Sequence, residues 1–118
     1  MYKLTPALYI WTHGYLKTIQ VGIQSAHVVA ELLLNYPNDL DPDGDVMTSM
    51  SMDWAEHHKT LRLLNGGTGD VFDSNLSEFN YLCRKYTVES ARFNEPDMGN
   101  MITAFGLVLD PGLIYRLE

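Results

Sequence analysis

The sequence holds little cysteine, few basic residues and no long apolar run. Its one cysteine, Cys83, cannot form a disulfide within the chain. No stretch reaches the roughly 18 consecutive apolar residues of a membrane span, and residues 1–6 do not begin a secretory signal. Eight Lys and Arg against 15 Asp and Glu give a net charge of −7, which disfavours electrostatic binding of nucleic acid. We therefore expect a soluble, cytoplasmic protein that does not contact membranes.

The composition of the chain is that of one globular domain. The chain has 118 residues, of which 46% are apolar and 19% charged. A chain of this length buries about two thirds of the surface that it exposes when unfolded. We expect residues 1–118 to form a single domain with its own core.

Hydrophobic patterning predicts an α/β fold. Apolar runs bounded by turn residues predict strands, and apolar residues spaced three and four apart predict helices. The expected order is β-α-β-α-β-β, with elements at residues 7–11, 18–35, 59–64, 74–85, 88–93 and 102–109. Strands that alternate with helices need crossover connections. The sequence therefore predicts a four-stranded mixed sheet with helices packed against it.

The first predicted helix carries apolar residues on more than one side. One face has the expected helical spacing: Ile19, Ile23, Ala26, Ala30, Leu33 and Leu34. Four more residues broaden the apolar surface: Val21, Val28, Val29 and Leu32. We expect this helix to pack on the sheet with one side and to contact other elements with another.

Residues 38–53 are rich in turn formers and have no hydrophobic period, which predicts a loop with a short helical turn near residues 49–56. Six acids and no base fall within residues 39–56. The segment from Asp39 to Asp45 resembles the start of an EF-hand calcium loop, but Met50 occupies the twelfth position, where such a loop needs a bidentate glutamate. We expect a solvated acidic loop, with no metal ion and no other cofactor.

Other clusters are weak candidates for chemistry. His57 and His58 are adjacent, and neighbouring side chains of an extended segment point to opposite faces, so they do not readily bind one metal ion. Cys83 lies on an apolar helix stripe and is expected to be a core thiol. The loop Gly66-Gly67-Thr68-Gly69 precedes a predicted helix, where α/β folds bind ligands. It lacks the known phosphate-binding glycine patterns, which favours a plain turn, with Thr68 kept as a candidate binding residue.

Two polar features are harder to dismiss. Gln24 and His27 lie three residues apart and therefore on one side of an otherwise apolar helix. They form either a binding patch or a pair of hydrogen-bonded core residues. The acidic turn from Glu95 to Asn100 leads into an apolar strand that includes Thr103.

Together these segments resemble the second type of peptidyl-tRNA hydrolase, the archaeal and eukaryotic-type family, and within it small proteins of tailed phages. The helix residues from Ile19 to His27 are similar to the family pattern Gly-Lys-x-x-x-Gln-x-x-His. The matches that follow in the same order are Trp54 before the second strand, Asp97-Met98-Gly99 for the Asp-Ala-Gly turn, Thr103, and Asp110-Pro111. The resemblance covers most of the chain and implies a small domain with a four-stranded mixed sheet.

The resemblance also implies site residues, and the departures put catalysis in question. In an active enzyme Asp97 would orient water, Thr103 would stabilise the oxyanion, and a lysine would supply positive charge. The family lysine aligns with Gln20, so Lys17 or Lys59 would have to replace it. About six residues are missing between Asp97 and Thr103, and Met101 stands at the offset of the family's first threonine. The candidate binding residues of the whole sequence are Gln20, Gln24, His27, Thr68 and Asn100.

Three functions remain open at this point. The first is a divergent, non-catalytic member of this fold that binds a small molecule, a nucleotide or a partner protein in the ancestral cleft. The second is an active peptidyl-tRNA hydrolase that acts on tRNA, in the host cytoplasm if the protein belongs to a phage. The third is an interaction module that contacts a basic protein through the Met-rich acidic loop, with residues Met47, Met50, Met52 and Trp54. The oligomeric state is left open.

Overall fold

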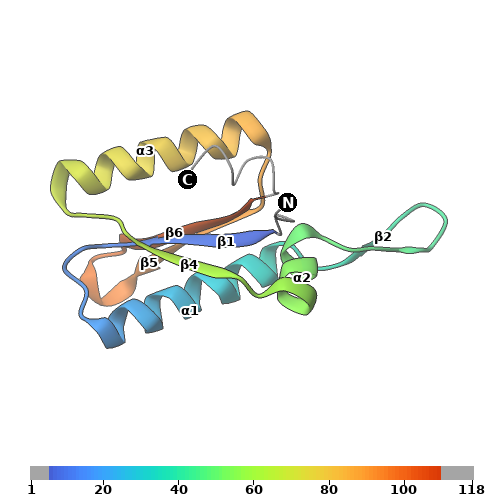
Figure 1. Ribbon diagram of the computed structural model, residues 1–118, viewed down its shortest axis with the longest axis horizontal. Helices are drawn as coiled ribbons and strands as arrows, with labels where there is room; N and C mark the ends of the chain where they lie inside the picture. The colour runs from blue at the N-terminus through green and yellow to red at the C-terminus, as the bar shows by residue number, and fades with distance from the viewer. Residues whose placement is uncertain (1–5, 110–118) are drawn as a thin grey trace, which may run out of the picture.

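Two long helices enclose a four-stranded sheet in the computed structural model, which describes residues 6–109 (Figure 1). Helices α1 and α3 cover opposite faces of the sheet. The elements are β1 (Ala7–Thr12), α1 (Thr18–Asn35), β2 (Asp39–Leu40), β3 (Val46–Met47), α2 (Met50–Asp53), the π-helical turn η1 (Trp54–His58), β4 (Leu61–Asn65), α3 (Gly69–Tyr86), β5 (Ser90–Glu95), the 3-10 turn η2 (Pro96–Met98) and β6 (Met101–Leu109). The predicted mixed sheet with helices packed against it is confirmed.

The sheet has the strand order β4-β1-β6-β5. β1 is parallel to β4 and antiparallel to β6, with Ile10 opposite Leu63 on one side and Gly106 on the other. β5 is antiparallel to β6, and its register shifts between Phe93 and Asn94. The two central strands are covered on both faces, which explains why they read as continuous apolar runs.

Each face of the sheet carries its own apolar cluster. Half of the cluster under α3 is aromatic, and its buried residues are Ala7, Tyr9, Phe72, Phe79, Leu82, Phe105, Leu107 and Leu109. The cluster under α1 is mainly aliphatic, and its buried residues are Leu8, Ile10, Val28, Leu32, Trp54, Ala91, Ala104 and Val108. Alternate residues of β1 and β6 therefore belong to opposite clusters, as the period of a strand requires.

The second long helix begins earlier than the sequence predicts. α3 starts at Gly69, and Thr68 occupies the N-cap position, whereas the sequence pattern predicts a start near residue 74. Phe72 is buried against the aromatic cluster, so tertiary packing extends the helix over a glycine-containing turn.

The acidic segment is a ribbon rather than a loop. β2 and β3 pair in an antiparallel arrangement and project beyond the three layers (Figure 1). The Asp41 side chain accepts hydrogen bonds from the backbone N–H groups of Asp43 and Asp45, both at 2.9 Å. The turn closes at Gly44 with a φ of +87°, a conformation that suits glycine. We call residues 39–47 the acidic ribbon.

The segment after the ribbon returns to the body of the protein. Trp54 is buried, and its indole N–H donates to the Thr60 carbonyl at 2.7 Å. Glu89 accepts hydrogen bonds from the backbone N–H and the hydroxyl of Ser51, at 2.9 and 2.7 Å. The carboxylate thus binds the N-terminal turn of α2 and holds it beside β5. Of the residues expected to form a Met-rich surface, Trp54 belongs to the core.

α1 buries a different side from the one with the clearest helical spacing. Its buried residues are Gln24, Ser25, Val28 and Leu32. In contrast, Ile19 is 79% exposed, Ile23 50% and Leu34 74%. The predicted packing against the sheet is present, and α2 contacts α1 as well. The face with Ile19 and Ile23 is nevertheless left uncovered by the described residues.

Within residues 6–109 no helix combines the length and the apolar character that crossing a membrane requires.

Gly106 lets α1 approach the central strands. A Cβ atom at this position would lie 2.7 Å from the Tyr9 carbonyl oxygen and 3.1 Å from Val28 Cγ1. We predict that Gly106→Ala lowers the free energy of unfolding by roughly 1–3 kcal/mol, because the core must shift to admit the methyl group. Gly22→Ala is the control, since a Cβ there would meet nothing within 4 Å. It should stabilise the helix by about 0.5–1 kcal/mol, and urea denaturation measures both values. Equal effects would contradict the packing argument.

Candidate functional site

A cleft opens where β1 ends and α1 begins, next to the turn that joins β5 to β6. It has a volume of about 300 Å³. Its walls combine polar, acidic and apolar side chains from four segments: His13, Tyr15, Leu16, Gln20, Gln24, Glu95, Asp97, Met98, Met101 and Thr103. We call it the β1–α1 cleft. Such a position, beyond the carboxyl end of a central strand, is where α/β sheets commonly bind ligands.

A chain of hydrogen bonds forms the floor of this cleft. The hydroxyl of Thr103 donates to Gln24 Oε1 at 2.8 Å, and Gln24 Nε2 donates to Glu95 Oε2 at 2.8 Å. Thr103 is fully buried and Gln24 is nearly so. Both polar ends of the Gln24 amide are therefore satisfied, which fixes its orientation and that of the carboxylate beyond it.

Glu95 is held in its ionised form by the groups around it. The hydrogen bond from the Gln24 amide lowers the pKa of the Glu95 carboxyl below its ordinary value of 4.5, and a hydrogen bond from the Asp97 backbone N–H adds to the effect. Burial acts in the opposite direction, and the attraction of His27 lowers the pKa of Glu95 a little further. A hydrogen bond to the charged form lowers a carboxyl pKa in this way. At neutral pH the cleft therefore contains a fixed negative charge.

His13 forms another wall of the cleft. Its Nδ1 accepts a hydrogen bond from the Tyr15 backbone N–H at 3.3 Å, so the neutral ring carries its proton on Nε2. The ring stacks on Tyr15, with 5.4 Å between centroids, and packs at 4.7 Å on Phe72. The backbone N–H of His13 donates to the Thr103 carbonyl at 2.8 Å, which ties the end of β1 to the buried end of the hydrogen-bond chain.

Four of the residues expected at a site meet in this cleft: Asp97, Thr103, Gln20 and Gln24. The side-chain oxygen of Gln20 accepts from the Lys17 backbone N–H at 3.2 Å and so stabilises the first turn of α1. Asp97 lies on η2, at the exposed rim of the cleft.

The other four expected residues lie outside the lining of the cleft. Lys17 is the exposed N-cap residue of α1. His27 stacks on Phe93, with 4.2 Å between centroids and 7° between planes. Thr68 caps α3, and its carbonyl accepts from the Val71 backbone N–H. Asn100 adopts a left-handed conformation with a φ of +61° in the turn before β6. Their proposed functional roles stay predictions.

The cleft also contains Glu95 and His13, which the sequence does not predict as individual site residues. Each is placed at an end of a strand, Glu95 on the last residue of β5 and His13 directly after β1. Polar residues directly after a strand that leads into a helix are a usable signal, because that end of the sheet is where ligands bind. For Glu95 the sequence offered no such signal, since β5 is an antiparallel edge strand.

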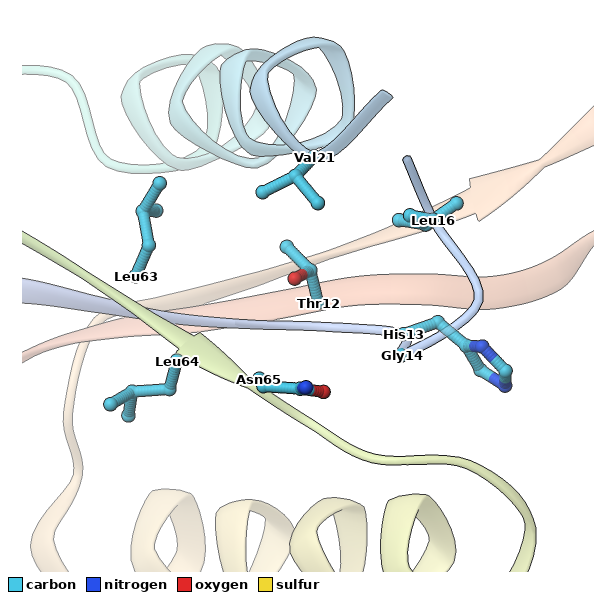
Figure 2. Close-up of a pocket in the computed structure, with 8 residues that line it drawn as sticks. All are labelled: Thr12, His13, Gly14, Leu16, Val21, Leu63, Leu64 and Asn65. Carbon is cyan, nitrogen blue, oxygen red and sulfur yellow. The ribbon is translucent and has the colours of Figure 1, made fainter. Parts of the chain in front are cut away.

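A second hollow of about 210 Å³ lies beside the cleft, where β1 and β4 end next to the start of α1 (Figure 2). Val21 of α1 and Leu63 lie on one side of β4, and Leu64 lies on the other. Its other lining residues are Thr12, His13, Gly14, Leu16 and Asn65. None of its lining residues is an aspartate, glutamate, lysine or arginine, so the fixed negative charge belongs to the β1–α1 cleft.

Pairs of potential metal ligands occur elsewhere, without a third member. His58 Nε2 lies 3.1 Å from Asp53 Oδ2, and His57 Nε2 lies 3.6 Å from Glu56 Oε2. In the part of the chain from residue 6 to 109, no three His, Cys, Asp or Glu residues lie close enough together to hold a metal ion.

No protein-family model matches the chain, and no curated protein or solved structure gives a significant match to it. The relationship to the peptidyl-tRNA hydrolases therefore stays a prediction from short motifs. A proposal of function rests on the fold and on the chemistry of the cleft.

The hydrogen bond between Thr103 and Gln24 can be tested by a double-mutant cycle. We predict a coupling of roughly 0.5–3 kcal/mol between Thr103→Val and Gln24→Leu, because each single change leaves the other buried polar group without its partner. The free energy of unfolding is measured by urea denaturation for both single variants and the double variant. Strictly additive effects would show that the two side chains act independently.

The ionisation of Glu95 supplies a second test. Its folded pKa lies below the ordinary value of 4.5, so its contacts add stability above that pH, and this stability is lost as pH falls through the folded pKa. We predict that Gln24→Leu raises the Glu95 pKa toward the ordinary value, as measured by NMR titration of the carboxyl carbon. Thr103→Val is the matched control, since it leaves the amide donor of Gln24 in place. An unchanged Glu95 pKa in Gln24→Leu would contradict the assignment.

Proposed function

We propose that this protein is a binding protein whose β1–α1 cleft takes a small ligand carrying a positive charge, such as an alkylammonium or guanidinium group with an apolar stem. In this proposal the chain is a divergent, non-catalytic member of the peptidyl-tRNA-hydrolase-like fold. The observation that carries it is the pair of acidic side chains in the cleft, Glu95 and Asp97, with no lysine or arginine among the lining residues.

Electrostatics favour a cation at this position. Glu95 is kept ionised by the Gln24 amide, and it is a half-buried residue of the cleft lining. A carboxylate with restricted access to water attracts a cation more strongly than one on an open surface. The same charge repels phosphate, so among the small molecule, nucleotide and tRNA that the sequence leaves open, the cleft favours the small molecule.

The remaining walls suit the rest of such a ligand. Leu16, Met98 and Met101 offer apolar contact, and methionine side chains adapt to irregular shapes. Tyr15 is 80% exposed, and its ring can lie against a cation or an aromatic group of the ligand. A ligand pocket with apolar walls and a few oriented polar groups has this composition.

Hydrolysis is less well supported than binding. Thr103 would have to stabilise an oxyanion, but its hydroxyl proton is already donated to Gln24. Lys17, which would supply positive charge, lies outside the lining of the cleft. Removal of an oxyanion donor costs on the order of a hundredfold or more in rate.

An active hydrolase remains the second candidate, because Asp97, Thr103 and the imidazole of His13 share one cleft. In that case Asp97 or His13 would take a proton from water.

The proposal is tested by NMR titration of the intact protein with three probes of similar shape: benzylamine, benzyl alcohol and benzoate. We expect benzylamine to shift the side-chain amide signals of Gln24, with benzyl alcohol weaker and benzoate without effect. The double variant Glu95→Gln, Asp97→Asn should weaken benzylamine binding by roughly tenfold or more, because both carboxylates are lost. Asp70→Asn, at an exposed position on α3, is the matched control and should leave binding unchanged.

A rate assay completes the test. Release of N-acetylated amino acid from acetyl-aminoacyl-tRNA at low salt is expected to stay at the buffer rate. A rate above that background that disappears in Asp97→Asn would overturn the binding proposal in favour of the hydrolase. Equal shifts from benzylamine and benzoate would show that charge does not select the ligand.

A further inference from the structure

The side of α1 that points away from the sheet is an exposed apolar surface. Figure 1 shows no other element beyond this side of the helix. At 100° per residue, one third of the helix circumference is made up entirely of apolar residues and glycine. They are Ile19, Gly22, Ile23, Ala26, Ala30, Leu33 and Leu34, all exposed except the half-buried Leu33. We call this surface the outer face of α1.

This outer face is unlike the solvent side of an ordinary surface helix, which is polar. The polar residues of α1 lie elsewhere: Gln24 faces the sheet, and His27 stacks on Phe93 of β5. Glu31 is the only charged residue within Thr18–Asn35, and it is four residues from His27, on the β5 side. Continuous exposed apolar surface of this kind marks an interaction site.

We propose that the outer face of α1 packs against the same face of a second copy of the chain, with the two helices antiparallel. Four residues of the outer face pair with one another about a point between residues 26 and 27. With the helices antiparallel about this point, Ile19 lies opposite Leu34 of the second copy, and Ile23 lies opposite its Ala30. A two-fold interface requires this kind of self-complementary surface.

The size of the side chains also fits a helix pair. Gly22, Ala26 and Ala30 are small residues of the central turns, and in the antiparallel pair Ala30 of one copy leaves room for Ile23 of the other. Ile19, Leu33 and Leu34 lie nearer the ends of the helix. Small residues at the crossing point allow a short distance between helix axes.

Charge at the two ends of α1 selects the antiparallel arrangement. Exposed Lys17 marks the N-terminal end, while the acidic ribbon, with Asp39 and Asp45, follows the C-terminal end (Figure 1). Antiparallel packing brings each Lys17 toward the acidic ribbon of the other copy and also opposes the two helix dipoles. Parallel packing would bring the two acidic ribbons together in a chain of net charge −7.

Sedimentation of the full chain over a range of concentrations tests the proposal. We expect a reversible dimer that Ile23→Glu weakens by roughly a hundredfold or more, since the charge would be buried without a partner. Ala30→Glu, at a second exposed position, should do the same. Leu61→Glu is the control, because β4 is an edge strand that also exposes leucine, 43% at this position. It should leave the dimer intact.

Two results of these sedimentation experiments would overturn the proposal. A wild-type chain that remains monomeric at roughly 100 µM, a concentration at which weak dimers form, would overturn the proposal. So would a dimer that Leu61→Glu disrupts while Ile23→Glu does not, since the interface would then be the edge of the sheet.

Disulfide trapping tests the direction of the helices in a Cys83→Ser background. Ala26→Cys, next to the two-fold axis, should give a covalent dimer under mild oxidation. Ile19→Cys alone and Leu34→Cys alone should not, whereas a mixture of these two variants should. Covalent dimers from Ile19→Cys alone would indicate parallel helices and contradict the proposal.

Discussion

The position of the cleft depends on how closely α1 approaches the two central strands. Gly106 of β6 leaves room for Val28, and the helix therefore lies directly against the backbone at this point. One turn earlier on α1 stands Gln24, and three residues earlier on β6 stands Thr103, where their side chains form a hydrogen bond. A larger residue at the glycine would push the helix outward and separate the two groups that orient Glu95. The contact between Gly106 and Val28 therefore supports both the packing of the core and the geometry of the cleft.

The order of elements and the mixed sheet could be predicted because turn residues separate long, clearly patterned segments. The start of α3 could not, because burial of Phe72 outweighs the low helix propensity of Gly69. For α1, periodicity shows that two sides are apolar but not which of them faces the sheet. Val28 and Leu32 are buried, while Ile19 and Ile23 have the same character and are exposed.

The same limit applies to the cleft. Gln24 could be selected because it is a polar residue on an otherwise apolar helix, whereas Asp97 and Thr103 follow only from the family resemblance. From the sequence, Glu95 is only the first residue of an acidic turn, because its approach to Gln24 spans 71 positions. An acidic residue in a turn is usually solvated, and only the fold shows that this one accepts the amide hydrogen bond that fixes its charge.

The acidic ribbon leaves the body of the protein between α1 and α2, and no strand of the main sheet passes through it. A break in its turn would divide the chain into one piece with β1 and α1 and another with the remaining three strands of the sheet and α3. β1 pairs with β4 on one side and with β6 on the other, so neither piece can complete the sheet alone. The ribbon is therefore a natural point at which this protein could be split into two complementary fragments that fold only when they meet.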